Sequence, residues 1–131
     1  MTFNLLEIDP AVARQGNEDS LNSLTDKEII SLNKTMAKVI LKQDIVSIFR
    51  LAETDTDSID SYVDKYAENF KLALMYLQLF LYYFERDVGE GSKARFRLEA
   101  YSRYYQALKS NFKNFDITTN TNSIAGRAIL G

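Results

Sequence analysis

The chain has 131 residues, a formal net charge of −2 and neither cysteine nor histidine. The absence of these two residue types excludes a disulfide framework, thiolate metal sites and Ser-His-Asp or Cys-His catalysis within the chain. Five glycines and one proline are too few for a turn-rich β architecture, and the 46% of hydrophobic residues are enough for a core. We therefore predict one all-α domain with terminal arms, no catalytic residues and no cofactor.

Residues 1–23 are predicted to form an N-terminal arm. Phe3, Leu5 and Leu6 are apolar, Pro10 ends the apolar run, and a polar stretch follows. Because proline removes a backbone donor, a short strand or an anchored extended segment is favoured over a helix here. We interpret Phe3, Leu5 and Leu6 as side chains that anchor this arm to a partner.

A helical bundle domain is predicted over residues 24–115, with its first helix over residues 25–52. Thr25 is a suitable N-cap, and Glu28 three residues later completes a capping box. Apolar residues then recur at intervals of three and four, as on one face of a helix. The polar stretch 54–58 is the predicted linker to the next helix.

The second helix is predicted over residues 58–87 and is the most hydrophobic part of the chain. Residues 72–84 are apolar on every face except at Gln78. A helix that is apolar all round must be buried all round, and this chain has few other helices to cover it. We therefore expect neighbouring subunits to help bury this helix. Its main seam advances by alternate steps of four and three and comprises Ile59, Val63, Tyr66, Phe70, Ala73, Leu77, Phe80 and Phe84.

A glycine turn at residues 89–91 precedes the third helix, for which Ser92 is the expected N-cap. The apolar seam of this helix runs from Ala94 to Phe115 by steps of three and four. Because the turn is short, the second and third helices are expected to pack as a long antiparallel hairpin. Together with the first helix, this hairpin predicts a three-helix bundle.

Basic residues concentrate on the third helix, whereas acidic residues concentrate in residues 1–28 and 53–68. Separate blocks of opposite charge suit contacts between subunits or with a partner. The same blocks could equally well neutralise each other within one monomer. We interpret Arg95, Arg97 and Arg103 as candidates for ion pairs between subunits. Basic residues interleaved with aromatic ones also suit a nucleic-acid backbone, so nucleic-acid binding by this helix is an alternative.

Residues 116–131 are predicted to form an extended C-terminal tail. A polar stretch without helical period is followed by an apolar hook that begins at residue 124. Fully extended, these sixteen residues reach about 50 Å. We interpret Ile124, Ile129 and Leu130 as anchors that latch onto a neighbour, with folding back onto the chain's own bundle as the alternative.

The densest group of carboxylates lies at the start of the second helix, where a Mg²⁺ or Ca²⁺ site is conceivable. An EF-hand loop that starts at Asp55 fails, because its sixth position is Asp60 instead of glycine and its twelfth position is Tyr66. Acidic residues in the first turn of a helix are ordinary partners of the helix dipole. We therefore predict no metal site from this group, which comprises Asp55, Asp57, Asp60 and Asp64.

The order of the predicted parts resembles that of the head–tail connector (adaptor) proteins of tailed bacteriophages. The shared pattern is a first helix (25–52), an alanine- and leucine-rich helix that ends in aromatic residues (72–86), a glycine turn, a further helix and an extended C-terminal arm. The β-hairpin insertion that several connectors carry is not seen in this sequence. The resemblance implies a homo-oligomeric ring, often of twelve copies, around a DNA channel, with the arms bound to portal and tail proteins.

The predicted function is therefore that of a structural connector in a viral particle, located in the virion after assembly in the host cytoplasm. The apolar run 72–84 spans about 20 Å as a helix, less than the ~30 Å hydrocarbon core of a bilayer, so no membrane partner is expected. Three alternatives stay open: a small helical regulator that binds a protein partner (an immunity or anti-host factor), a helical nucleic-acid-binding protein and, last, an enzyme. Each of these would be cytoplasmic.

Overall fold

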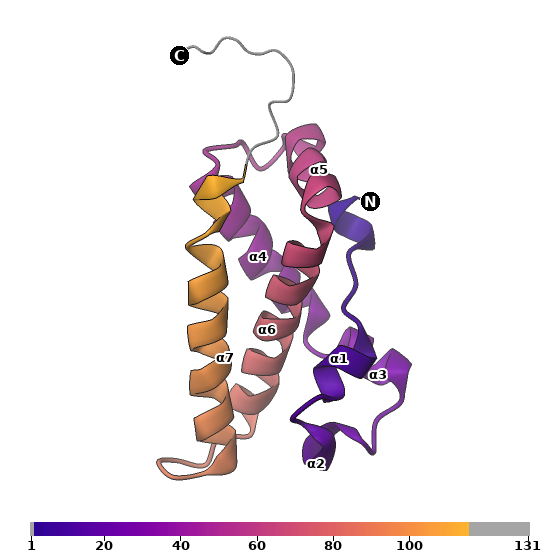
Figure 1. Cartoon of the computed structure of the whole chain (residues 1–131), viewed down its shortest axis with the longest axis vertical. Helices are drawn as coiled ribbons and strands as arrows, with labels where there is room; N and C mark the ends of the chain where they lie inside the picture. Colours follow the sequence, from indigo (N-terminus) through magenta and orange to yellow (C-terminus); the bar gives the residue numbers. More distant parts are fainter. Residues whose placement is uncertain (1, 116–131) are drawn as a thin grey trace.

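The computed structural model describes residues 2–115, in which every regular element is a helix (Figure 1). This confirms the predicted all-α class for the described part of the chain. In chain order the elements are η1 (Phe3–Leu5), α1 (Pro10–Arg14), α2 (Glu18–Leu21), α3 (Asp26–Ser31), α4 (Lys34–Ile48), α5 (Thr56–Lys65), α6 (Ala67–Glu85), α7 (Lys93–Lys109) and η2 (Phe112–Asn114).

Helices α6 and α7 make the most extensive contact in the fold and lie side by side (Figure 1). Local chemistry sets the turn between them. Gly89 and Gly91 have positive φ angles of 121° and 83°, which glycine reaches without a Cβ clash. Ser92 caps α7, because its Oγ accepts a hydrogen bond of 3.0 Å from the backbone N–H of Arg95. The predicted glycine turn and N-cap are thereby confirmed.

The first predicted helix is interrupted, which corrects the continuous helix expected over residues 25–52. Its start is as predicted, since Thr25 and Glu28 form the capping box. The interruption falls at Asn33, which has a left-handed φ of 51° between α3 and α4. Asparagine is one of the few non-glycine residues that visit this conformation readily.

Gln78 of α6 stabilises the interruption. Its side chain is buried, and its Nε2 donates to the carbonyl oxygens of Ile30 at 3.0 Å and Leu32 at 2.7 Å. The carbonyl groups at the end of a helix lack partners within the helix, so a donor from a neighbouring helix can satisfy them. The single polar residue of the apolar run is therefore a helix-terminating contact.

The second predicted helix is also divided, into α5 and α6, at Tyr66. This residue has φ −120° and ψ 39°, outside the helical region, and its ring stacks on that of Phe115 with the centroids 4.0 Å apart. At the start of α5, Oδ1 of Asp55 accepts a hydrogen bond of 3.2 Å from the backbone N–H of Ser58. One of the acidic residues considered as a metal ligand is therefore a helix cap.

The N-terminal residues fold onto the bundle as short helices, which corrects the extended arm predicted for residues 1–23. Asp9 caps α1 by accepting a hydrogen bond of 2.9 Å from the backbone N–H of Ala11. Pro10 occupies the first helical position, where its missing N–H removes no helical hydrogen bond. Leu6 is fully buried. The proline that was expected to oppose a helix starts one instead.

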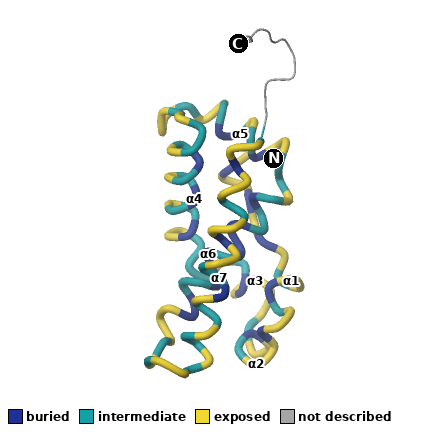
Figure 2. Tube along the Cα trace, turned by 60° about the vertical axis from the view of Figure 1, so that its left-hand side comes forward, coloured by how far each residue is buried: buried dark blue, intermediate teal, exposed yellow. Residues whose placement is uncertain are grey.

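Most of α6 is buried by its own chain. The N-terminal helices reach α6 through hydrogen bonds from Tyr82 and Tyr83 to residues 17–20, and α4 packs on another face. Leu79 and Tyr83 are only 1% and 2% exposed and Tyr76 is half-buried, so the chain itself covers most of this helix, and a contribution from neighbouring subunits stays a prediction for its exposed part. Figure 2 shows that buried positions alternate with exposed ones along α4, as expected for a helix with one inner face.

Candidate functional site

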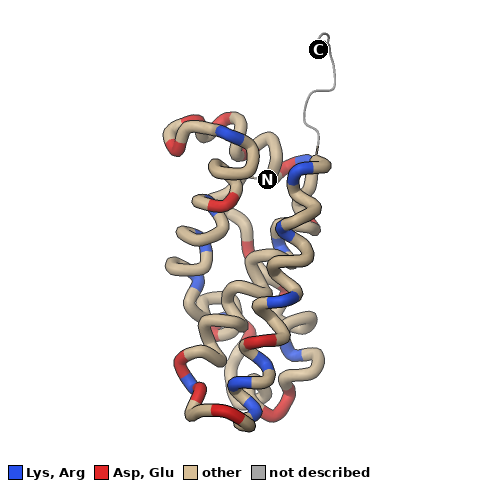
Figure 3. Tube along the Cα trace, turned by 90° about the vertical axis from the view of Figure 1, so that its left-hand side faces the viewer, with Lys and Arg blue, Asp and Glu red and all other residues tan. Residues whose placement is uncertain are grey.

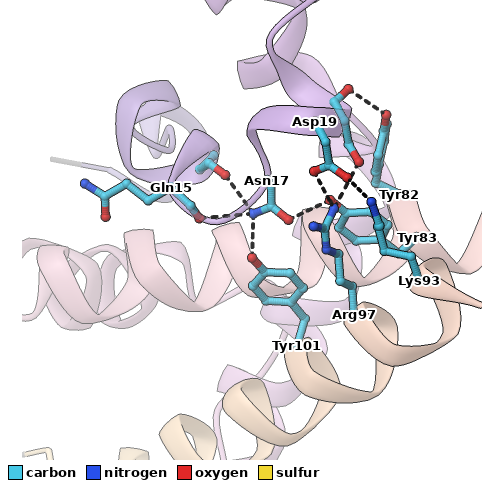
Figure 4. Close-up of polar contacts among 10 residues, drawn as sticks. Gln15, Asn17, Asp19, Tyr82, Tyr83, Lys93, Arg97 and Tyr101 are labelled. Atoms are coloured by element: carbon cyan, nitrogen blue, oxygen red, sulfur yellow. Dashed lines mark hydrogen bonds and ion pairs between the residues drawn. The ribbon is translucent and has the colours of Figure 1, made fainter.

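A buried polar network joins the N-terminal segment to α6 and α7 (Figure 4). At its centre is Asn17, which lies between α1 and α2 and is buried. Its Nδ2 donates to the carbonyl oxygen of Ala13 at 2.9 Å and to the hydroxyl of Tyr101 at 2.6 Å. Its Oδ1 accepts a hydrogen bond of 2.6 Å from the hydroxyl of Tyr83. The buried amide thus has partners for both its nitrogen and its oxygen, as buried polar groups generally do.

Charged side chains close this network toward the solvent (Figure 4). Nη1 of Arg97 donates to Oδ1 of Asp19 at 2.8 Å and to the hydroxyl of Tyr83 at 3.0 Å. Nζ of Lys93 donates to Oδ2 of Asp19 at 2.7 Å. The hydrogen bonds from Lys93 and Arg97 lower the pKa of Asp19 to about 2. Each charged side chain of the network has a hydrogen-bond partner within it. The network therefore has a structural role, because it holds the segment around α2 against α6 and α7.

The lowered pKa of Asp19 predicts a pH dependence of stability. A carboxyl group with a lower pKa in the folded chain stabilises the fold above its unfolded pKa, near 3.8 here, and this contribution is lost as the pH falls toward about 2. We therefore expect Asp19→Asn to lower the urea midpoint at about pH 7, and the two midpoints to converge by about pH 2. Glu18→Gln, at an exposed neighbouring acid, is the control. A midpoint difference that does not change with pH would contradict the prediction.

The three arginines predicted to make subunit contacts lie in different settings. Arg95 forms an ion pair of 2.6 Å with Asp87, and its hydrogen bond lowers the pKa of that carboxyl group. Arg97 pairs with Asp19. Both arginines are satisfied within their own chain, which corrects their assignment to ion pairs between subunits. Arg103 is exposed and has no ion pair within residues 2–115, so its role at a subunit contact stays a prediction.

The predicted N-terminal anchors also lie in different settings, two of them buried and one exposed. Phe3 and Leu6 are buried in the chain's own core, which corrects their assignment to a partner contact, whereas Leu5 is 69% exposed. The backbone N–H of Phe3 donates to Oδ1 of Asp60 at 2.8 Å, so α5 holds the start of the chain. The predicted tail anchors, which lie outside the described residues, are Ile124, Ile129 and Leu130.

A groove with a volume of about 300 Å³ runs between α4 and α7. Leu77 and Phe80 of α6 form its floor, because α4 and α7 both pack on α6 and make little contact with each other. A polar bridge crosses it: the hydroxyl of Tyr105 donates to Asp44, and Nζ of Lys109 lies 3.6 Å from the same carboxylate. Burial and this hydrogen bond raise the pKa of Tyr105. This α4–α7 groove is lined by Ile40, Asp44, Leu77, Phe80, Ser102, Tyr105, Gln106 and Lys109.

An apolar stripe, formed by the half-buried Phe80 and the exposed Phe84 of α6 and by the exposed Val88 in the turn after this helix, continues from the floor of the groove. The rings of Phe80 and Phe84 stack with centroids 6.1 Å apart, and Phe84 and Val88 are 60% and 88% exposed. The sequence seam placed Phe84 in the core, which the structure corrects. The reason is the position of α4, which begins near Gln78 and runs toward the α5 end (Figure 1), so α4 does not extend along the last turn of α6, where Phe84 lies. The sequence carries no signal for this uncovered length, because it depends on where the first predicted helix breaks.

Within residues 2–115, no group of three or more acidic side chains is arranged to hold a metal ion. No helix in this part of the chain is both long and apolar enough to cross a bilayer. Comparisons with known protein families, with curated proteins and with solved structures find no match to this chain. A proposal for its function therefore depends on the geometry of the polar network, the α4–α7 groove and the apolar stripe.

Proposed function

We propose that this chain is a structural protein that acts by binding other protein surfaces, as a connector in a homo-oligomeric ring between the portal and the tail of a viral particle. In this proposal each subunit contributes a bundle of α4, the α5–α6 pair and α7. DNA passes through the channel of the ring without sequence-specific contact, and the subunits meet partners through exposed apolar surface.

The apolar stripe is the observation that carries the proposal. Phe80 and Phe84 lie one turn apart on the same face of α6, Val88 lies in the turn that follows this helix, and Phe84 and Val88 are mostly exposed. Contiguous exposed apolar surface on a soluble protein commonly marks an interaction site, and aromatic residues are enriched in the cores of interfaces. The stripe also borders the α4–α7 groove, which gives a partner both a concave and a flat region to bind.

The charges of α7 favour protein binding over nucleic-acid binding. Figure 3 shows acidic positions close to the basic ones at the end of the molecule that holds the α6–α7 turn. A surface that binds phosphates needs positive charge that the protein itself does not neutralise. The four basic residues of α7 that have acidic partners within the chain are Lys93, Arg95, Arg97 and Lys109.

The proposal is tested by measuring molar mass by light scattering over a range of concentrations. We expect the wild type to associate, and we expect Phe84→Glu to raise the dissociation constant by about tenfold or more, because burying an unpaired carboxylate in an apolar contact costs more than ~1.4 kcal/mol. Phe96→Glu is the matched control, since Phe96 is 69% exposed and lies outside the groove and the stripe.

Far-UV circular dichroism verifies that both variants keep the wild-type helix content. Loss of association in Phe84→Glu alone supports binding through the stripe. Equal loss in both variants would assign the effect to surface charge in general and contradict the proposal. A wild type that stays monomeric at every concentration and binds no hydrophobic dye would contradict it as well.

A further inference from the structure

We propose that the α4–α7 groove is the docking site for the C-terminal segment of the same chain, residues 116–131. In this arrangement Ile124, Ile129 and Leu130 pack against the floor of the groove, and Phe84 and Val88 stay open to a partner. The inference rests on the proposed function, because it identifies what fills the groove beside the proposed binding surface in the free protein and therefore what a partner that enters the groove has to displace.

The described part of the chain ends close to the groove. η2 contacts α4, and Figure 1 places this contact at the end of the molecule where α4 gives way to α5. Lys109, which lines the groove, is only six residues before Phe115, the last residue described. The segment 116–131 therefore starts at the end of the molecule to which the Lys109 side of the groove points.

The length of the segment matches the distance that it has to cover. Between Phe115 and the level of Tyr105, a helix rises about 15 Å, and to the level of Ser102, the first residue of α7 that lines the groove, about 20 Å. Residues 116–123, which are polar except for Ile117, span up to about 28 Å when extended. Ile124 is thus the first residue that is both apolar and able to lie anywhere along the groove, and the apolar residues follow from there.

The chemistry of the segment suits an apolar groove with a polar bridge. Beyond Asp116 its single charged side chain is Arg127, so little charge has to leave water on docking. The carboxylate of Asp44 lines the groove, and because Tyr105 and Lys109 both engage its Oδ2, its Oδ1 offers a partner of opposite charge to Arg127. A segment rich in acidic residues would lack this complementarity.

Tethering identifies the chain's own segment, rather than that of a second copy, as the occupant. A segment attached by a short flexible linker has an effective concentration on the order of millimolar at a site that it can reach. A second copy competes only when the protein itself approaches that concentration. At lower concentrations the chain's own segment therefore occupies the groove. The apparent association constant of a partner is then its intrinsic value multiplied by the fraction of chains in which the groove is open.

Disulfide cross-linking of the full chain tests the inference, because the natural sequence has no cysteine. The test variant is Ser102→Cys/Ala128→Cys, in which Ser102 lines the groove. The control is Ala107→Cys/Ala128→Cys, because Ala107 is exposed on α7, nearer the end of the described chain and outside the groove. Each variant is oxidised mildly at micromolar concentration, and the products are separated under non-reducing conditions.

We expect Ser102→Cys/Ala128→Cys to form a monomeric disulfide roughly tenfold faster than the control, because docking raises the local concentration of the thiol introduced in the segment above that of a free tether. Equal rates would overturn the inference, since proximity alone favours position 107. A disulfide-linked dimer as the main product would overturn it too, by showing that a second copy supplies the segment.

The cross-linking result separates this inference from the proposed function. If Phe84→Glu abolishes association but cross-linking shows no preference for position 102, the stripe binds partners and the tail docks elsewhere. If cross-linking prefers position 102 but Phe84→Glu leaves association unchanged, the tail docks in the groove and the proposed binding role of the stripe is wrong.

Discussion

Replacing Phe70 with alanine is expected to lower the free energy of unfolding by about 3–5 kcal/mol, the range for truncating a fully buried phenylalanine. Phe70 has no exposed surface, and its ring centroid lies 4.9 Å from that of Phe112 and 5.6 Å from that of Phe115. These rings join α6 to the end of the described chain. The lost side chain would leave a cavity between elements that the rest of the core holds apart. Urea unfolding followed by circular dichroism measures the loss.

Phe84→Ala is the matched control for this prediction. It changes the same residue type on the same helix, but at a position that is 60% exposed. We expect a change of no more than about 0.5 kcal/mol, as for other surface substitutions away from special features. Similar losses for the two variants would show that the stripe is buried in solution, either by the chain or by a partner.

Replacing Asn17 with alanine is expected to lower the free energy of unfolding by about 2–4 kcal/mol, because two tyrosine hydroxyls each lose a hydrogen bond in a largely buried network. The hydroxyl of Tyr83 loses its acceptor and that of Tyr101 loses its donor. Leaving a buried polar group without a partner costs more than an average hydrogen bond contributes. The variant also releases the contact that fastens the loop between α1 and α2.

Asn22→Ala is the control for this second prediction, since Asn22 is an exposed asparagine in the same segment. A double variant, Asn17→Ala/Tyr83→Phe, tests the network directly. Because Tyr83→Phe removes the hydroxyl donor whose acceptor is lost in Asn17→Ala, the combined loss should be smaller than the sum of the single losses. Additive losses in urea unfolding would show that the two side chains act independently.

The polar network also bears on the proposed function. It fixes the N-terminal helices over one face of α6, while α4 covers another and α7 a third. The remaining face beyond Gln78 is the apolar stripe, so the position of the binding surface follows from what the N-terminal segment and α4 cover. Substitutions in the network are therefore expected to act on stability first, whereas substitutions in the stripe act on binding.

Local signals in the sequence predicted the ends of several helices correctly. The capping box of Thr25 and Glu28, the glycine turn after α6 and the Ser92 cap of α7 all depend on residues within a few positions of one another. Such signals need no knowledge of the rest of the fold. The all-α class followed in the same way, from helical periodicity and the scarcity of glycine and proline.

The N-terminal segment was not predictable by the same means. Its pattern of a few apolar residues, a proline and a polar stretch fits an extended arm as well as two short helices. Helices as short as α1 and α2 are not stable alone, because nucleation is costly. They form here because Tyr83, Tyr101 and Arg97, at least 66 residues further along the chain, supply hydrogen bonds to them.

The sequence by itself determined the all-α class, the caps at Thr25 and Ser92 and that the chain has no cysteine or histidine chemistry, because each of these depends on composition or on neighbours in the chain. Only the tertiary structure decided which arginines are satisfied internally, that Phe3 and Leu6 are core residues, and that the seam of α6 is buried at Phe70 but open at Phe84. The physical reason is that burial depends on how far each covering helix extends, and the break at Asn33, held by Gln78, sets that length for α4.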